Sequence, residues 1–435
     1  MQANPFRHGE FANLASLGID PSFFKFGVTT LESEKYVCVR DKDGQGTPQI
    51  SIVELTNGNN IVRRPGSKVD GAIMHITDNI ISLKAPNDPS GHILQIFNLS
   101  SKAKLKHIEF SENIVFWRWV NKNILAVVTT TSVYHVNISN ESKEQKVFER
   151  SGDLKEDQII GYVLGPDEKW GALFGISSPD GGKTINGHIQ LYFIEGGKQQ
   201  LLEGHACTFG KAYLHNESHK SNIFCFVERK SGEKNSTVHI TEISPPPEGA
   251  GKFKKNTAIN YDPETPNDFP IALVVAENYG VLYIITKFGF VYLYEITTCE
   301  QIYKVRVANG AVFAAAKNHT KDGILAITKN GSLYGGLIDE NVLVMHLMNN
   351  CKHIPNVQQL AFTLAGRYNL PGVDNMFLSQ FNNYLVNGDY ANAAKIASMS
   401  PGTLLRNQET INKFKTLPQT PGQPQPLLIY FQKLL

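Results

Sequence analysis

The sequence predicts a mainly β chain, with a seven-bladed β-propeller over residues 1–342 and the beginning of an α-helical solenoid over residues 343–435. Two observations carry this prediction. An alternating apolar pattern recurs seven times before residue 340, and its copies start roughly 40 to 55 residues apart, a period typical of propeller blades. From Val344 onward the apolar residues follow helical spacing instead.

The seven copies of the pattern are predicted strands, because alternation of apolar and polar residues is typical of a strand with one buried face. Most copies follow an apolar run and a tight turn; Lys287-Phe288-Gly289 is one such turn, and Asn330-Gly331 is a hairpin signal. Three or four strands per period describe a propeller blade, although a pair of β-sandwiches fits the same pattern. The copies are QISIVEL, ILQIFNL, SVYHVNI, HIQLYFI, TVHITEI, FVYLYEI and SLYGGLI.

The predicted helices are short and joined by short loops. In NVQQLAFTLAGRYNL the apolar residues recur at i, i+3, i+4 and i+7, and Pro371-Gly372 then interrupts the helical spacing. Small alanines in GDYANAAKIASMS allow neighbouring helices to approach closely. Such an array is typical of an α-solenoid. Because a solenoid needs a capping repeat, we expect the protein to continue beyond Leu435.

Composition excludes several classes of protein. The chain has 42 basic and 40 acidic residues, which argues against a nucleic-acid binder with a generally basic surface. Its five cysteines stand singly, without the spacing of a zinc site or a disulfide framework, and indicate a reducing compartment. The N-terminus lacks a signal peptide, and no apolar run reaches the ~18 residues of a membrane span.

The sequence offers no set of catalytic residues. G-x-S-x-G and H-E-x-x-H motifs are both absent. The stretch Asp180-Gly181-Gly182-Lys183 resembles a phosphate loop but lacks its spacing, so a hairpin turn is the better interpretation. His205 and Cys207 are interpreted as a strand-end histidine near a buried cysteine. We therefore expect no enzyme activity, no cofactor and no metal site.

The stretch ILQIFNLSSKAKLKH carries an unusual cluster of charge. Lys102, Lys104 and Lys106 occupy every second position, so an extended strand would place all three on one face, where like charges repel. Gln95 and Phe97 share a face of the preceding strand. An amide, an aromatic ring and ammonium groups in a groove would suit an extended peptide with bulky apolar residues and an acid. The alternative is a solvated edge strand whose lysines prevent unwanted pairing.

Several segments of the chain resemble the N-terminal domain of the clathrin heavy chain family. They include TLESEKYVCVR, RRPGSKVDGAIMH, FWRWV, HIQLYFIEGG, NDFPIALVV and ITKFGFVYLYEI, and the helical segments NYLVNGDYANAAKIAS and PGQPQPLLIYFQKLL resemble the beginning of the family's leg. The resemblance implies a non-catalytic vesicle coat scaffold on the cytoplasmic face of coated pits and vesicles. It also implies partners among adaptor proteins, a full-length trimer with light chains, and no direct contact with nucleic acid or membrane. The alternatives are a propeller enzyme and a propeller–solenoid subunit of another coat, tether or pore complex.

The resemblance implies a peptide groove between the first two blades, in which Gln95 and Phe97 hold the peptide while Lys102 and Lys104 meet its acid. Two features depart from the family. Gly66 replaces an aliphatic residue, and the loop over residues 86–91 is longer; either change would alter the choice of peptide. The matching residues are Arg64, Ile81, Ile93, Gln95, Phe97, Lys102 and Lys104.

Three further sites are implied by the same resemblance. One is a site on top of the propeller that takes a tryptophan-containing motif, and its residues are Phe26, Gln158, Ile160 and Ile176. The alternative is that Ile160 and Ile176 are core strand residues. A groove between blades 4 and 5 has Gly196 where the family has arginine, and its residues are Trp170, Leu191, Gln200 and Leu202. A fourth site between the last two blades rests on Glu10 alone.

Overall fold

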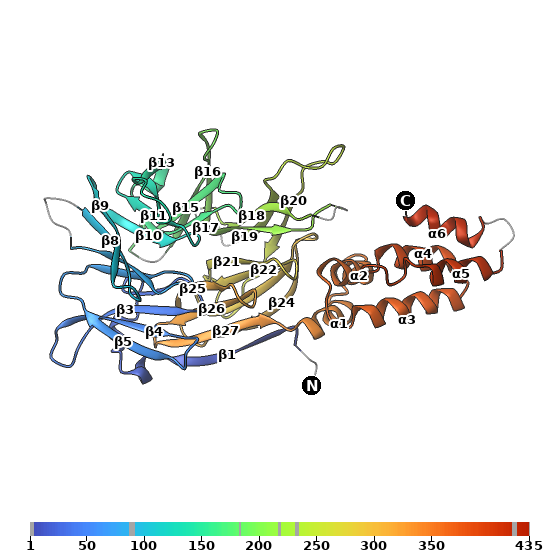
Figure 1. Cartoon of the computed structure of the whole chain (residues 1–435), viewed down its shortest axis with the longest axis horizontal. Coiled ribbons are helices and arrows are strands. Elements are labelled where there is room, and N and C mark those ends of the chain that lie inside the picture. Colours follow the sequence, from blue (N-terminus) through green and yellow to red (C-terminus); the bar gives the residue numbers. More distant parts are fainter. Residues whose placement is uncertain are drawn as a thin grey trace. The chain divides into compact units, whose positions relative to one another are not determined.

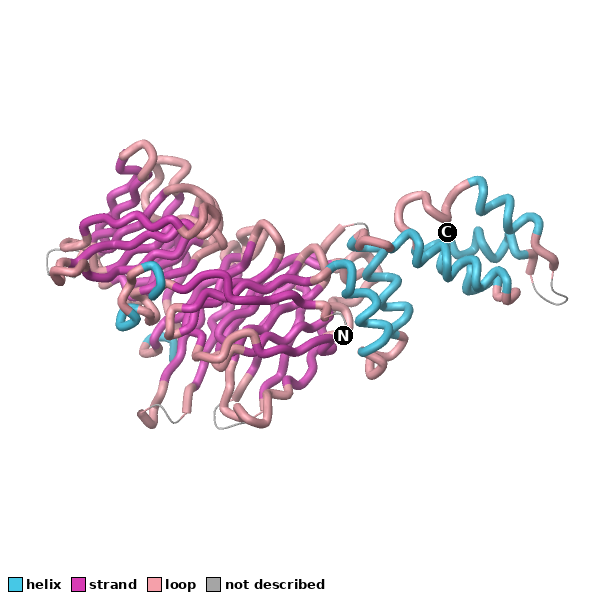
Figure 2. Tube along the Cα trace, turned by 90° about the horizontal axis from the view of Figure 1, so that it is seen from below, coloured by secondary structure: helices cyan, strands magenta, loops and turns pink. Residues whose placement is uncertain are grey.

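Strands fill the chain up to residue 338, and helices follow (Figures 1 and 2). The structure is a computed structural model that describes residues 4–86, 92–181, 184–215, 219–230, 235–419 and 424–434. It divides into two compact units: a strand unit of residues 8–277 and 281–337, and a helical unit that contains residues 338–435 with residues 1–7 and 278–280. No helix in these described ranges has the length and apolar character that a membrane crossing requires.

Twenty of the described strands form five four-stranded sheets (Figure 1). In four of these sheets the spatial order of the strands follows the chain: β2 (Thr29–Leu31), β3 (Tyr36–Lys42), β4 (Pro48–Glu54), β5 (Asn60–Pro65); β6 (Gly71–Met74), β7 (Ile80–Lys84), β8 (His92–Asn98), β9 (Ala103–Phe110); β10 (Ile114–Trp119), β11 (Ile124–Thr129), β12 (Ser132–Asn137), β13 (Gln145–Glu149); and β21 (Pro270–Ala276), β22 (Val281–Thr286), β23 (Phe290–Glu295), β24 (Glu300–Arg306). The fifth joins distant parts of the chain, in the spatial order β1 (Phe6–Asn13), β27 (Ser332–Ile338), β26 (Gly323–Thr328), β25 (Val312–Asn318).

The remaining strands form one continuous seven-stranded sheet, so the described strands give five separate four-stranded sheets rather than the seven that were predicted. The cause is β17, a 15-residue strand without an internal turn. Its residues 198–203 pair with β16, and its residues 204–212 pair with β18. The strands are β14 (Gln158–Leu164), β15 (Trp170–Ser177), β16 (Asn186–Phe193), β17 (Lys198–Ala212), β18 (Ser221–Glu228), β19 (Ser236–Glu242) and β20 (Lys254–Ile259).

Apolar side chains fill the space between successive sheets, which gives the strand unit a β-propeller arrangement. Cys38 and Ile50 of one sheet pack with Met74 and Ile81 of the next in a single buried cluster. A further cluster joins the first sheet in the chain, through Val37 and its neighbours, to Ile327 near the end of the strand unit. Each of the seven alternating segments lies on a strand, as predicted: β4, β8, β12, β16, β19, β23 and β27.

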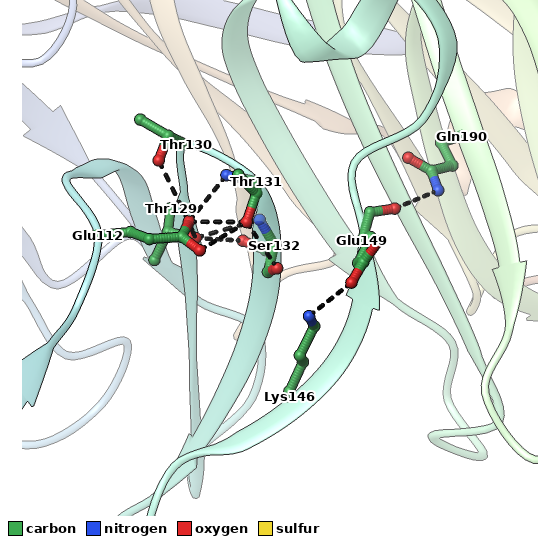
Figure 3. A network of polar contacts seen from close by, with 8 residues as sticks. All are labelled: Glu112, Thr129, Thr130, Thr131, Ser132, Lys146, Glu149 and Gln190. Carbon is green, nitrogen blue, oxygen red and sulfur yellow. Dashed lines mark hydrogen bonds and ion pairs between the residues drawn. The ribbon is translucent and has the colours of Figure 1, made fainter.

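A carboxylate fixes the tight hairpin between β11 and β12 (Figure 3). Glu112 accepts hydrogen bonds from the hydroxyls of Thr129 and Thr131, each at 2.7 Å, and from the backbone N–H of Thr131 at 3.0 Å. Burial raises the pKa of Glu112, but these hydrogen bonds to its ionised form outweigh burial and lower the pKa to about 2. The ionised side chain therefore acts as a clamp on the hairpin.

The described helical unit contains six short helices and no long solenoid (Figure 1). The predicted interruption at Pro371-Gly372 is confirmed, since Gly372 has a φ of 75° and separates two helices. Asp339, Asp389 and Asn407 cap three helix N-termini by accepting backbone N–H bonds. The helices are α1 (Glu340–Asn350), α2 (Val357–Tyr368), α3 (Val373–Val386), α4 (Tyr390–Met399), α5 (Gln408–Thr416) and α6 (Pro426–Leu434).

Candidate functional site

One face of the β6–β9 sheet carries most of the residues predicted for the first groove, and we call it the Gln95 face. Its side chains form cross-strand rows, because directly opposed residues of antiparallel strands lie on the same side of a sheet. Each row runs from an apolar residue on an inner strand to a polar or charged residue on β9. The rows are Ile81–Phe97–Lys104, Leu83–Gln95–His107 and Ile93–Glu109.

The three clustered lysines do not share this face, so that prediction is wrong. Lys102 precedes β9 and has a φ of 55°, which places it in the turn rather than on an extended strand. Lys104 pairs with Phe97, but Lys106 pairs with Ile96, and the intervening Leu105 has no partner in the register. This bulge turns Lys106 to the opposite face, where its ammonium group donates to the Ser142 carbonyl at 2.9 Å.

The amide of Gln95 is held in place by a histidine that sequence reasoning missed. Gln95 Nε2 lies 3.1 Å from Nδ1 of His107, and Nε2 of His107 lies 3.2 Å from a carboxylate oxygen of Glu109. With Nδ1 as acceptor, the Gln95 amide donates to the ring, and the ring donates to Glu109. The carbonyl oxygen of Gln95 then remains available to accept a bond from a peptide N–H.

The apolar end of the Gln95 face continues into the cluster between the first two sheets. Phe97 and Leu83 are half-buried against that cluster, and Ile81 is a buried member of it. Arg64 is exposed on β5 and pairs with Ile50, another member, so it lies on the side of its own sheet that faces β6–β9. The structure thus brings Arg64 and the Gln95 face to the same junction of two sheets.

The two departures from the family affect this junction differently. Gly66 is buried, and a Cβ atom added there would lie 2.9 Å from the carbonyl carbon of Gln49, so the backbone itself requires glycine at this position. In the predicted 86–91 loop, residues 87–91 lie outside the described residues. Residues 182 and 183 of the predicted hairpin turn lie outside them as well.

The four residues predicted for the top site line one cavity of about 550 Å³. Phe26 is 40% exposed and lies parallel to Phe116, with ring centroids 6.4 Å apart. Gln158 pairs directly with Ile176, and Ile160 and Ile176 are half-buried at the cavity rather than fully enclosed. The strands that line the cavity are β2, β6, β10, β14, β15, β17, β21 and β25.

Charged groups of the cavity are partly neutralised in pairs. Arg118 lies 3.6 Å from Glu32; burial raises the pKa of Glu32, and the guanidinium opposes that rise. Burial also lowers the pKa of the Lys287 ammonium group. The cavity wall therefore combines aromatic and aliphatic surface with a few charged groups, and burial of these groups away from water disfavours their charged forms.

The third predicted set lies on one face of the seven-stranded sheet. Leu191 pairs with Gln200, and Trp170 lies beside Phe193 with ring centroids 4.8 Å apart. Leu191 is only 8% exposed, so it packs in the core under this face and has little surface with which to contact a peptide. Phe193 was not predicted; its ring fills the space at Gly196, where an added Cβ would lie 2.5 Å away.

The remaining predicted positions are separate from these sets. Glu10 is exposed on β1, in another sheet. His205 is buried; burial lowers its pKa to about 4, and its Nε2 lies 2.8 Å from the Ile185 carbonyl. Burial raises the pKa of the Cys207 thiol well above its ordinary value. Within the described ranges, no three metal-binding side chains gather at one point.

Comparison with known proteins identifies relatives along the whole chain. A probable clathrin heavy chain from Schizosaccharomyces pombe is 36% identical over 435 residues, covering 100% of this chain and 25% of the relative. The clathrin heavy chain of Drosophila melanogaster is 36% identical over 437 residues, and clathrin heavy chain 1 of Oryza sativa is 34% identical over 437 residues, with coverages of 100% and 99% of this chain. The family model described as Clathrin-H-link matches residues 369–434. The chain spans about a quarter of the length of these relatives.

Proposed function

The chain belongs to the clathrin heavy chain family, and from this premise we propose that its strand unit docks short peptide motifs of adaptor proteins within a vesicle coat. The proposed motif contains a leucine, a second bulky apolar residue and an acid. The role is that of a non-catalytic scaffold on the cytoplasmic face of coated pits and coated vesicles, in endocytosis and other vesicle transport.

The observation that carries this proposal is the row Ile81–Phe97–Lys104. It leads from a buried aliphatic residue, across a half-buried aromatic ring, to an exposed ammonium group within three strands. A peptide lying across these strands would bury apolar side chains at one end and meet Lys104 and Lys102 with its carboxylate at the other. Gln95 would accept a backbone N–H, while Ile93 and Arg64 would border the peptide.

Each such contact is weak. An exposed ion pair contributes roughly 0.2–1 kcal/mol, so a motif of a few residues should bind in the micromolar to millimolar range. Coat assembly links many sites, and linkage raises apparent affinity by roughly 10²-fold or more. Weak single sites therefore suit a lattice that has to assemble and come apart.

The wider organisation is part of the proposal. We count the seven-stranded sheet as two blades that share β17, which gives seven blades over residues 1–342. Residues 343–435 would begin the α-solenoid leg, and the trimer and its light chains would involve regions beyond this chain.

Three further sites are part of the proposal. The cavity with Phe26 would take a tryptophan-containing motif, and the face with Trp170 and Gln200 would take an apolar motif. Glu10 would belong to a fourth site.

The bulge at Leu105 supplies a matched test. A fluorescent peptide of the leucine–apolar–acid type is titrated into the unmodified chain, into Lys104→Glu and into Lys106→Glu, which carry the same change of charge. Because only Lys104 lies on the Gln95 face, Lys104→Glu should weaken binding by about threefold to tenfold, and Lys106→Glu by less than about twofold.

Equal weakening by the two variants would show that general charge, not this face, controls binding. No binding by the unmodified chain would contradict adaptor docking at the Gln95 face. Capture of tether or pore subunits without any adaptor by the immobilised chain would favour a different propeller–solenoid complex.

A further inference from the structure

The helical unit contains a second recess that none of the proposed sites uses. It has a volume of about 560 Å³ and lies among α1, the loop after it, α2, α3 and α4; we call it the Lys352 pocket. Its size is in the range of cavities that hold one or two large side chains. The residues that matter for its chemistry are Met348, Lys352, Gln359, Phe362, Lys395 and Met399.

The pocket is positively charged. Lys352 and Lys395 are the charged residues among the described side chains that line it. Lys395 donates to the Gln359 amide oxygen at 2.6 Å, a neutral partner that leaves its charge uncompensated. Within the described residues, no carboxylate lies within ion-pair distance of either lysine. Asp389, which holds Asn392 at the rim, is engaged with the backbone and side chain of that residue at 3.1 and 2.7 Å.

The start of α2 adds to the positive character. Asn356 has a φ of 54°, its side chain does not cap the helix, and the first turn contains no acidic residue. The uncompensated N–H groups of a helix N-terminus carry partial positive charge. Asn356, Val357 and Gln358 all line the pocket, so this charge lies beside that of Lys352.

The other wall is apolar and adaptable. Met348 and Met399 are half-buried at the pocket, and flexible methionine side chains adjust to different apolar partners. Phe362 is buried beneath them and is fixed by an edge-on contact with Phe377, with ring centroids 5.1 Å apart. A rigid floor with a movable rim suits an inserted aliphatic or aromatic side chain.

We propose that the Lys352 pocket binds a short extended peptide in which a bulky apolar side chain stands next to acidic ones. The apolar side chain lies on Met348, Met399 and Phe362, and the carboxylates lie toward Lys352, Lys395 and the start of α2. Charge complementarity determines this choice of partner, because the described part of the chain supplies neither lysine with a carboxylate. The site is independent of the Gln95 face.

Methionine methyl groups allow each site to be observed separately. The chain has six methionines; Met348 and Met399 line the Lys352 pocket, whereas Met74 belongs to the cluster beneath the Gln95 face. Peptide GSGDFDFGS is titrated into the full chain labelled with ¹³C at the methionine methyls. We expect the Met348 and Met399 signals to shift and those of Met345 and Met376, which lie outside the pocket, to stay in place.

Matched charge reversals complete the test. Lys352→Glu with Lys395→Glu should weaken binding seen at Met348 and Met399 by about fivefold to tenfold, and Lys415→Glu with Lys433→Glu, the same change of charge on α5 and α6, should not. Lys352→Gln with Lys395→Gln gives the same comparison with a smaller perturbation, should the double reversal disturb folding.

Three results would overturn the proposal. One is that Met348 and Met399 do not shift at millimolar peptide. Another is that the neutral peptide GSGNFNFGS binds equally well, because the charges then play no part. The third is that the two signals move with protein concentration alone, which would mean that a second copy of the chain occupies the pocket. A shift confined to Met74 that Lys104→Glu abolishes would support the Gln95 face alone.

Discussion

Lys104 and Lys106 have the same side chain and lie two positions apart, yet the bulge at Leu105 gives them different surroundings. Lys104 lies on the Gln95 face opposite Phe97, and Lys106 bonds to Ser142 on the other side of the sheet. Simple alternation predicts one face for both, because it assumes an unbroken register. The separation of the two ammonium groups also removes the like-charge repulsion that a shared face would impose.

Gly66 is a residue at which we expect a side chain to harm folding. A Cβ atom there would approach the Gln49 backbone to within 2.9 Å, and backbone atoms cannot rotate away. Gly66→Val should therefore lower the free energy of unfolding by about 1–3 kcal/mol. Gly44→Ala is the control, since nothing lies within 4 Å of its Cβ position and it should change stability by less than about 1 kcal/mol. Urea denaturation measures both, and equal stability of Gly66→Val and the unmodified chain would contradict the close approach.

At the scale of elements, the β11–β12 hairpin depends on an ionised carboxylate (Figure 3). Glu112→Gln keeps the size of the side chain but loses its charge and its full set of acceptors, so it should cost about 1–2 kcal/mol at about pH 7. Glu149→Gln is the matched control, because Glu149 forms an exposed ion pair with Lys146 and should cost less than about 1 kcal/mol.

The Glu112 contribution should depend on pH in a definite direction. Its folded pKa of about 2 is below the ordinary value of 4.5, so the folded state binds fewer protons than the unfolded one between these values. The stabilisation is therefore complete above about pH 4.5 and is lost as pH falls toward 2. The difference in unfolding free energy between the unmodified chain and Glu112→Gln should shrink over that range. A difference that stays constant between about pH 7 and about pH 3 would contradict the clamp.

Local signals in the sequence predict the elements well and their connections less well. Alternation in segments such as FVYLYEI predicted strands that the structure contains, and Pro371-Gly372 correctly predicted a helix boundary. The continuity of β17 could not be predicted, because Glu203 followed by Gly204 resembles the polar residues that commonly end a strand. His107, Glu109 and Phe193 were missed for another reason: their roles depend on cross-strand partners, and register is a tertiary property.

At the scale of the whole molecule, the strand unit depends on contacts between the two ends of its chain. β1 pairs with β27, more than 300 residues later, and Leu14 donates its backbone N–H to the Gly331 carbonyl at 2.9 Å. The cluster that joins Leu14 and Val37 to Ile327 and Leu333 links the first sheet to the last. The entropy of closing so long a loop opposes this pairing, so the contacts of β1 and of this cluster have to offset that cost.

Deletion of residues 1–13 should therefore act on the distant strand β27 first. Without β1, β27 becomes an edge strand with unpaired N–H and C=O groups. The unpaired N–H groups exchange their hydrogens with solvent, and both kinds of group favour pairing with another chain. Hydrogen exchange monitored by mass spectrometry should show faster exchange in β27 and then in β26, while β22 and β23, which lie inside another sheet, keep their protection. A chain that lacks only residues 1–4 is the control, because it retains all of β1 and should leave β27 unchanged. Slow exchange of β27 after the longer deletion would mean that the sheet closes without its first strand.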